Sequence, residues 1–403
     1  MIGSFAKICA VSFCIFGLEI ASATEIYPFF LQRQDGTILD GYFSPPSTSC
    51  SPIIFAIQGS SCESTLEWHK NLCDQANALG LGMIAIEKQG ISKEGIDLLE
   101  YHQTNCLQKR LEDTMFCLEN MHLICPEWEG KMIFWGESEG GAIAANLAGQ
   151  TPQTAAVLLF ATGGGLKPRE EVKCALRHRL KKHGAMQDEI DQYMIFLEEQ
   201  MDIMMLDPTP DKQFLGKTYK WWASLLIANE ASLALDQHSL PIYLVHGVED
   251  SQIPVLSADL AAKNLKETNT LTYHRLEGYG HNLDTADIHA AAYHWINSIL
   301  YGNGQLNSEP IVLKVSSQPP PSEDWKTDIA HYTFSLGKGE AHGEARVDRD
   351  DKGNEKASVD VGVRYETDNG VEWDVSAGAS AGRDSHGNTS GEVHAEVSGS
   401  KRF

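Results

Sequence analysis

The chain has 403 residues, of which 42% are hydrophobic and 22% charged, the composition of an ordinary globular protein. It is too long for one average domain and suits a catalytic domain of roughly 250 to 300 residues with a smaller companion. A net charge of -23 makes nucleic acid a poor partner. Beyond the N-terminus, no apolar run reaches the roughly 18 residues that could span a bilayer.

The N-terminus has the pattern of a secretory signal peptide. Lys7 precedes an apolar stretch from Ile8 to Leu18, and Ala21-Ser22-Ala23 places small residues where a signal peptidase cuts. We expect residues 1–23 to be removed and the mature protein to be secreted or periplasmic. The alternatives are a lipoprotein site at Cys14, which a bulky preceding residue disfavours, and a retained anchor, for which the apolar run is short.

Seven cysteines remain after such cleavage, and export would place them where disulfides persist. An odd number leaves at least one unpaired within the chain. The first six fall within residues 50–125, so we expect disulfide bonds that staple the early part of the catalytic domain, in pairings that the sequence leaves open. No spacing is that of a zinc site, and we expect neither a metal nor another cofactor. The seven are Cys50, Cys62, Cys73, Cys106, Cys117, Cys125 and Cys174.

The segment after the signal predicts a hairpin followed by alternating strands and helices. Glu25 to Phe43 has apolar runs on both sides of Gln34-Asp35-Gly36, the expected turn. Continuous apolar runs then alternate with helical patterns, which predicts a mostly parallel sheet covered on both faces. The expected strands are 53–57, 83–86, 132–135, 155–161, 242–245 and 271–276, and the expected helices are 65–79, 107–121, 140–148, 255–265 and 286–299.

The strand pattern stops between Lys167 and Leu235, where a charged helical stretch begins. We expect a helical cap insertion at about 166–236, within a catalytic domain of residues 24–304. Its methionine-rich stripe is either the buried face of a cap helix or the lining of a mobile lid over an acyl pocket. The stripe consists of Ile190, Met194, Leu197, Met201 and Met204.

The C-terminal part has a different composition. Residues 305–330 contain three consecutive prolines and predict a linker. Apolar and polar residues alternate in residues 331–403. This pattern predicts a small antiparallel all-β module of four strands with one solvent-exposed face. So small a sheet is stable only if its apolar side packs on something, and the candidates are the catalytic domain, a second copy of the chain and an envelope component.

A short motif lies between an apolar strand and a helix of small residues. Gly136-Glu137-Ser138-Glu139-Gly140 matches G-x-S-x-G, in which the turn is so sharp that side chains at the glycines would collide with strand or helix. Such a turn holds the Ser138 hydroxyl clear of the sheet and leaves the amide of Glu139 able to stabilise an oxyanion. The alternative is an ordinary strand–helix turn with a capping serine.

A serine nucleophile needs a histidine base and a carboxylate that orients this base. The strand 242–245 runs into a loop that contains Glu249 and Asp250, and the next strand ends in Gly278-Tyr279-Gly280-His281. Asp250 and His281 are therefore the candidate partners of the serine. Glu249 is interpreted as a solvated loop charge, and His246 as a packed or hydrogen-bonding residue.

Together these features resemble the α/β-hydrolase family over residues 25–304. The resemblance rests on G-x-S-x-G, on the H-G-x-x-D-x-x-x-P stretch from His246 to Pro254, and on G-x-G-H at Gly278 to His281. It implies an α/β fold with a mostly parallel eight-stranded sheet, and acyl transfer through a serine ester.

The resemblance also implies the role of each residue. Ser138 would be the nucleophile, Asp250 the orienting acid and His281 the base. Gln58-Gly59-Ser60 occupies the place of the second oxyanion element, so the backbone amide of Ser60 would join that of Glu139 as a donor. This chain has Gln58 where a histidine often stands, but the donor is a main-chain group.

The expected function is that of a secreted serine hydrolase that cleaves a small-molecule ester. A peptidase or thioesterase of the same fold is an alternative, since Glu87-Lys88-Gln89-Gly90 and the stretch 217–222 loosely resemble peptidase-like relatives. A different alternative is a surface-binding protein whose C-terminal β module is the functional part. Glu137 and Glu139 either favour a cationic substrate or are solvated charges of the turn.

Overall fold

The computed structural model describes residues 25–236 and 238–302 with their side chains, and five C-terminal strands between residues 330 and 401 by their backbone. The expected signal peptide of residues 1–23, and all but the last residue of the linker expected at 305–330, lie outside the described residues.

The chain divides into two compact units. The first comprises Met1–His178, Gln192–Gln213 and Lys217–Pro321, and the second comprises Arg179–Asp191, Phe214–Gly216 and Ser322–Phe403.

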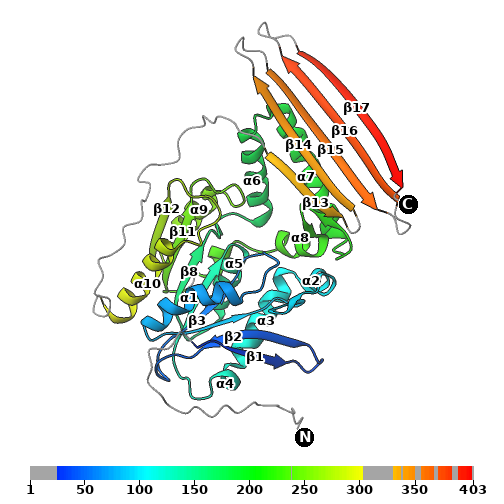
Figure 1. The fold of residues 1–403 in the computed structure, drawn as a ribbon. Coiled ribbons are helices and arrows are strands. Elements are labelled where there is room, and N and C mark those ends of the chain that lie inside the picture. The colour runs from blue at the N-terminus through cyan, green and yellow to red at the C-terminus, as the bar shows by residue number, and fades with distance from the viewer. Residues whose placement is uncertain are drawn as a thin grey trace. The chain divides into compact units, whose positions relative to one another are not determined.

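An eight-stranded sheet forms the centre of the first unit (Figure 1). Its strand order is β1-β2-β4-β3-β7-β8-β11-β12. β2 pairs antiparallel with β1 and with β4, whereas all the other neighbours are parallel. The expected hairpin and the mostly parallel sheet are thereby confirmed. The strands are β1 (Tyr27–Gln32), β2 (Ile38–Ser44), β3 (Ile53–Ile57), β4 (Gly82–Ile86), β7 (Met132–Glu137), β8 (Thr154–Phe160), β11 (Pro241–Gly247) and β12 (Thr270–Leu276).

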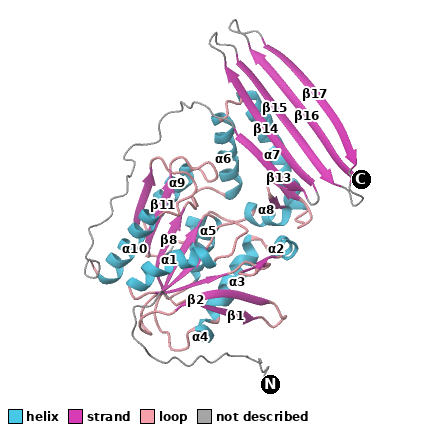
Figure 2. Ribbon diagram, viewed as in Figure 1, coloured by secondary structure: helices cyan, strands magenta, loops and turns pink. Residues whose placement is uncertain are grey.

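Helices cover both faces of this sheet (Figure 2). One core lies between the sheet and α3, α5 and α9, and the other lies between the sheet and α1 and α10. Among the described residues, no helix combines the length and the apolar content that a membrane crossing needs. The helices are α1 (Leu66–Ala78), α2 (Leu98–Thr104), α3 (Leu107–Glu119), α4 (Met121–Ile124), α5 (Glu139–Gln150), α9 (Val255–Leu265) and α10 (Ala286–Tyr301).

The two cores explain why the central strands are apolar without interruption. Along β3, Ile53, Phe55 and Ile57 enter one core, and Ile54 and Ala56 enter the other. All five are buried, and each large aliphatic or aromatic side chain contributes about 1.5–3 kcal/mol on leaving water. A strand buried on both faces therefore shows no polar alternation.

The segment between β4 and α3 holds elements that the sequence patterns did not predict. β5 (Ile91–Ser92) and β6 (Gly95–Ile96) form a two-residue antiparallel pair ahead of α2. Asp97 caps α2, because its side chain accepts a hydrogen bond from the amide of Glu100 at 3.0 Å. These elements are too short for the hydrophobic periodicity of a strand or helix to be recognised in the sequence.

The expected insertion is helical. It contains α6 (Pro168–Lys182), α7 (Gln187–Leu206), two short strands, β9 (Gln213–Phe214) and β10 (Lys217–Thr218), then α8 (Tyr219–Leu226) and a 3-10 helix, η1 (Ala231–Ala234). The five residues of the methionine-rich stripe lie on α7 and are all buried. Their burial favours a packed helix face over the lining of a mobile lid.

The second unit contains a five-stranded antiparallel sheet in the order β13-β14-β15-β16-β17. The prediction of four strands is wrong, because β13 precedes them. Its alternation of Tyr332, Phe334 and Leu336 is a short strand signal next to the proline-rich linker. The register aligns Val363, Val375 and Val397 in one row of the same face. The strands are β13 (Ala330–Leu336), β14 (Gly339–Arg349), β15 (Glu355–Glu366), β16 (Val371–Arg383) and β17 (Thr389–Lys401).

The expected disulfide bonds are absent from the structure, in which all seven cysteines from Cys50 to Cys174 are free. Two of them lie on opposite faces of the sheet, because Cys73 packs in the core under α1 and Cys117 packs in the other core. Burial also raises the pKa of the Cys73 thiol to about 12, as expected of an inert core thiol.

Candidate active site

Ser138 lies at the turn between β7 and α5, in a backbone conformation that non-glycine residues rarely adopt. Its φ is 53° and its ψ is -123°. A residue held in such a region costs on the order of 1–3 kcal/mol unless its surroundings impose it. Here the amide of Ser138 donates to the carbonyl of Phe160 at 2.8 Å, and the amide of Gly141 donates to the carbonyl of Ser138 at 3.0 Å. The turn is thus fixed from both sides.

The glycines of the motif are required by the close approach of main chain. A Cβ on Gly136 would lie 2.4 Å from the carbonyl oxygen of Gly140, and a Cβ on Gly140 would lie 2.0 Å from that of Ile57. Both contacts are far inside van der Waals distance and involve backbone that cannot move aside. The collision predicted from the sequence is therefore real at both positions.

The structure brings Ser138, His281 and Asp250 together at the carboxyl-terminal side of the sheet. Ser138 follows β7, Asp250 follows β11 and His281 follows β12. His281 Nε2 lies 3.0 Å from Ser138 Oγ, and His281 Nδ1 lies 2.7 Å from Asp250 Oδ2. With the proton on Nδ1 donated to the carboxylate, Nε2 accepts from the serine hydroxyl. This polarity suits a base that removes the hydroxyl proton.

Asp250 is held in its ionised form. The residue is 4% exposed, and Oδ1 accepts hydrogen bonds from the backbone amides of Gln252 at 2.8 Å and Ile253 at 2.9 Å. Burial by itself raises the pKa of Asp250, but hydrogen bonds from His246 and His281 outweigh it and hold the pKa well below its usual value. Glu249 is exposed and makes none of these contacts.

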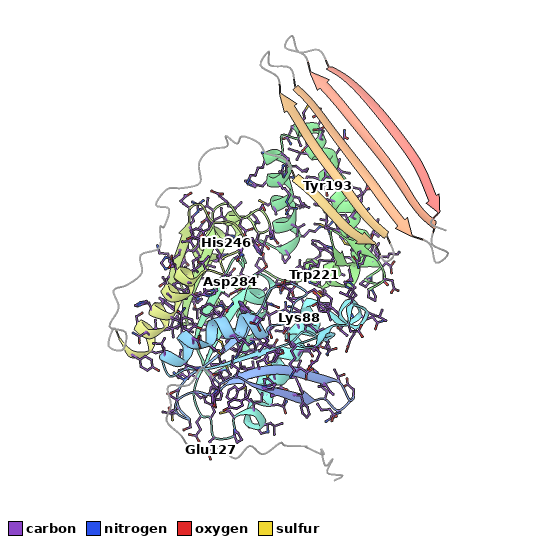
Figure 3. All side chains as sticks on the ribbon, viewed as in Figure 1. Lys88, Glu127, Tyr193, Trp221, His246 and Asp284 are labelled. Carbon is purple, nitrogen blue, oxygen red and sulfur yellow. The ribbon has the colours of Figure 1, made fainter. Side chains whose placement is uncertain are left out.

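His246 supports the same carboxylate from inside the sheet. It is fully buried on β11, with Nε2 2.9 Å from the carbonyl oxygen of Ile253 and 3.3 Å from Asp250 Oδ2 (labelled in Figure 3). The interpretation of His246 as a hydrogen-bonding residue fits this position, and the structure adds its partners, Ile253 and Asp250. The four-residue spacing from His246 to Asp250 across one tight loop was the available signal.

The loop Gln58-Gly59-Ser60 lies directly against the serine. A Cβ on Gly59 would be 3.1 Å from Ser138 Cβ and 3.7 Å from Ser138 Oγ. Glu139 lies on the other side of the serine as the first residue of α5. The two segments expected to supply oxyanion donors therefore flank Ser138, and the roles of the Ser60 and Glu139 amides remain predictions.

Glu137 and Glu139 are not the solvated charges considered from the sequence. Glu139 is 7% exposed, and its carboxylate pairs with Arg110 and accepts from the indole of Trp221. Glu137 accepts from the indole N–H groups of Trp68 at 3.1 Å and Trp135 at 3.2 Å. Both carboxylates are thus bound by protein groups.

Glu137 carries a strongly perturbed carboxyl group. Burial raises its pKa to about 7, and the two indole hydrogen bonds only partly offset this effect. A carboxyl group that titrates near neutrality therefore precedes the serine in the chain.

Motif reasoning missed Arg110, because it lies in a helix whose pattern predicted only packing. The available signal was an arginine in the middle of a helix expected to cover the sheet.

In the part of the chain that the structure describes, no cluster of three or more His, Cys, Asp or Glu side chains could hold a metal ion.

Comparison with known proteins gives one family. The family model described as serine aminopeptidase, S33, matches residues 56–285, a span that includes Ser138, Asp250 and His281. A search of curated proteins finds no match.

Several solved structures are similar to this chain. A thermostable carboxyl esterase from Bacillus coagulans is 15% identical, with a TM-score of 0.49 over 68% of this chain and 98% of that one. Est1E from Butyrivibrio proteoclasticus is 14% identical, with a TM-score of 0.46 over 68% and 98%. Alpha/beta hydrolase domain-containing protein 10 from mouse is 16% identical, with a TM-score of 0.45 over the same 68% and 98%.

The raised pKa of Glu137 predicts a pH-dependent stability. Its carboxyl group titrates near 4.5 when unfolded and near 7 when folded, so the folded state binds more protons within this window. The free energy of unfolding should therefore fall as the pH rises from about 4.5 to about 7. We expect a loss of roughly 2 kcal/mol, which is less than the full linkage value because the side chain is 22% exposed.

Glu137→Gln keeps an acceptor oxygen for the indoles and removes the titration. Urea unfolding between pH 4.5 and 8 should give the variant a flatter stability profile than the wild type, while the exposed Glu119→Gln control follows the wild type. Parallel profiles for wild type and Glu137→Gln would contradict this prediction.

Proposed function

Because the chain belongs to the serine aminopeptidase S33 family of α/β hydrolases, we propose that it is a serine hydrolase that cleaves carboxylic esters through Ser138. The observation that carries the proposal is the hydrogen-bonded line from Ser138 Oγ through His281 to Asp250. A serine hydroxyl is a weak nucleophile near neutral pH, and this line supplies the base that activates it.

In the proposed reaction, Ser138 Oγ attacks the ester carbonyl while His281 Nε2 takes the hydroxyl proton. The imidazolium that forms is stabilised by the Asp250 carboxylate, which stays ionised. The tetrahedral oxyanion accepts hydrogen bonds from the backbone amides of Glu139 and Ser60. His281 then returns the proton to the leaving alcohol, and an acyl group remains on Ser138.

Water releases this acyl group in a second half of the reaction. His281 removes a proton from the water as it attacks the acyl carbonyl, and the same amides stabilise the second oxyanion. Collapse returns the proton to Ser138 Oγ and frees the carboxylic acid. Both halves use the same three side chains, so the proposal needs no further reactant besides the ester and water.

Peptide hydrolysis is the second candidate, and the description of the matching family favours it. An aminopeptidase must bind the α-ammonium group of its substrate, for which a free carboxylate near the nucleophile is suited. The two carboxylates that flank Ser138 are engaged already, Glu139 by Arg110 and Glu137 by two indoles. This occupancy supports esters as the first substrate class.

Labelling with a fluorophosphonate probe tests the nucleophile. The wild type should be labelled and Ser138→Ala should not, although both fold. Labelling that persists in Ser138→Ala would overturn the assignment of the serine.

A comparison of substrates tests ester against peptide hydrolysis. In matched assays, a p-nitrophenyl ester should be hydrolysed at least about a hundredfold faster than an aminoacyl p-nitroanilide. A preference for the anilide would favour the peptidase.

Substitution of the two adjacent acids tests which of them orients the base. Asp250→Asn should lower kcat by about a thousandfold or more, because the neutral amide no longer stabilises the imidazolium and favours the wrong tautomer. Glu249→Gln should change kcat less than about twofold, since Glu249 is exposed. The reverse ranking would refute the assignment of Asp250.

The N-terminal pattern supports export as part of the proposal. If a signal peptidase cleaves after Ala23, the mature protein recovered outside the cytoplasm should begin at Thr24. N-terminal sequencing of that fraction provides the measurement. A mature protein that still begins at Met1 would contradict this part of the proposal.

A further inference from the structure

The two segments that flank Ser138 are joined by one buried side chain. Arg110 projects from α3 and is 9% exposed. Its Nη1 donates to the carbonyl oxygen of Gly59 at 3.3 Å and also contacts Glu139 Oε1. Its Nη2 donates to the carbonyl oxygen of Gln58 at 2.5 Å. One guanidinium therefore binds both the loop Gln58-Gly59-Ser60 and the first residue of α5.

These contacts set the direction of the loop amides. In a trans peptide the C=O of one residue and the N–H of the next point in opposite directions. Arg110 holds the carbonyl oxygen of Gly59, so the N–H of Ser60 is directed away from the guanidinium. A Cβ on Gly59 would, in turn, lie 3.1 Å from Ser138 Cβ. The amide expected to bind the oxyanion thus takes its orientation from Arg110.

Other side chains secure the same two segments. The carbonyl oxygen of Ser60 accepts from Lys217 Nζ at 2.5 Å, and the side-chain oxygen of Gln58 accepts from Lys88 Nζ at 2.5 Å. On the other segment, the indole of Trp221 donates to Glu139 Oε2 at 2.5 Å. Figure 3 labels Lys88, in the loop after β4, and Trp221, in α8.

A buried ion pair of this kind is a poor source of net stability, because desolvation of the two charges offsets much of their attraction. Its effect on geometry is larger. The guanidinium is a rigid planar fork, so three simultaneous acceptors fix the distances among them. A lysine at this position could hold the charge but could not reproduce the fork.

We propose that Arg110 is a positioning residue for the oxyanion hole, which it sets by holding the loop 58–60 and Glu139 at a fixed separation. This inference rests on the proposed serine-hydrolase function. It predicts that loss of the fork weakens binding of the tetrahedral intermediate more than binding of the substrate, because only the intermediate carries the oxyanion.

The test compares Arg110→Lys with the double variant Arg110→Gln/Glu139→Gln, which removes both charges of the buried pair. Lys109→Gln is the matched control, since Lys109 is the preceding residue of α3 and pairs with Asp113. For each protein, kcat and KM are measured with a p-nitrophenyl ester, and Ki is measured with a trifluoromethyl ketone, which forms a tetrahedral oxyanion on the serine. Melting temperatures report on folding.

In both Arg110 variants kcat should fall about tenfold to a hundredfold, and Ki should rise by a similar factor, while KM changes less than about threefold. Lys109→Gln should match the wild type in all three constants. Folded Arg110 variants whose Ki and kcat equal those of the wild type would overturn the inference while leaving the proposed function intact. A wild type without ester turnover or Ser138-dependent labelling would overturn the proposed function, and this inference with it.

Discussion

Close contact between main-chain segments at Ser138 is the constraint on which the rest of the site depends. The carbonyl oxygens of Gly140 and Ile57 occupy the space that side chains on Gly136 and Gly140 would fill. This contact allows Ser138 to keep a positive φ, and it brings β3, the end of β7 and the start of α5 together. The loop after β3 consequently lies next to Ser138. The order of the parallel strands thus brings the loop 58–60 next to Ser138, and Arg110 then binds both this loop and Glu139.

Buried charges complete this arrangement, each with its partners. Asp250 keeps its charge because two backbone amides and two imidazoles surround it. Glu139 keeps its place because Arg110 and Trp221 bind one carboxylate oxygen each. Isolated charges in such surroundings would be costly. Instead they connect elements far apart in sequence, and the hydrogen bond from Trp221 joins α8 of the insertion to the residue that follows Ser138.

The sequence predicted the central sheet well, because strands buried on both faces and amphipathic helices leave strong periodic signals. The hairpin at the sheet edge and the mostly parallel order were confirmed. The misses have physical causes. β5, β6 and α2 are too short for their hydrophobic periodicity to be recognised, and β13 lies beside a proline-rich segment. Cysteine spacing cannot tell on which face of a sheet a thiol lies, and the expected disulfides are not seen in the structure.

For the candidate site, local motifs predicted some of the residues that the structure brings together and gave no indication of others. Ser138, Asp250 and His281 belong to short patterns at strand ends, and the structure places His281 within hydrogen-bond distance of both Ser138 and Asp250. Arg110 acts over sequence separations of about fifty and about thirty residues, on Gln58 and on Glu139. No local pattern encodes such a contact, because it arises only when α3 packs on the sheet. The identity of the substrate likewise has no local sequence pattern, because the residues that would bind it come from segments far apart in the chain.

The most direct test of the central claim is to trap the covalent intermediate during turnover. The enzyme is mixed with a slowly hydrolysed ester, quenched in acid within the first turnovers, digested and examined by mass spectrometry. The account predicts the mass of the acyl group on the peptide that contains Ser138, at a level that follows the steady-state rate. Turnover without an acylated peptide, or an acyl group on another residue, would contradict it.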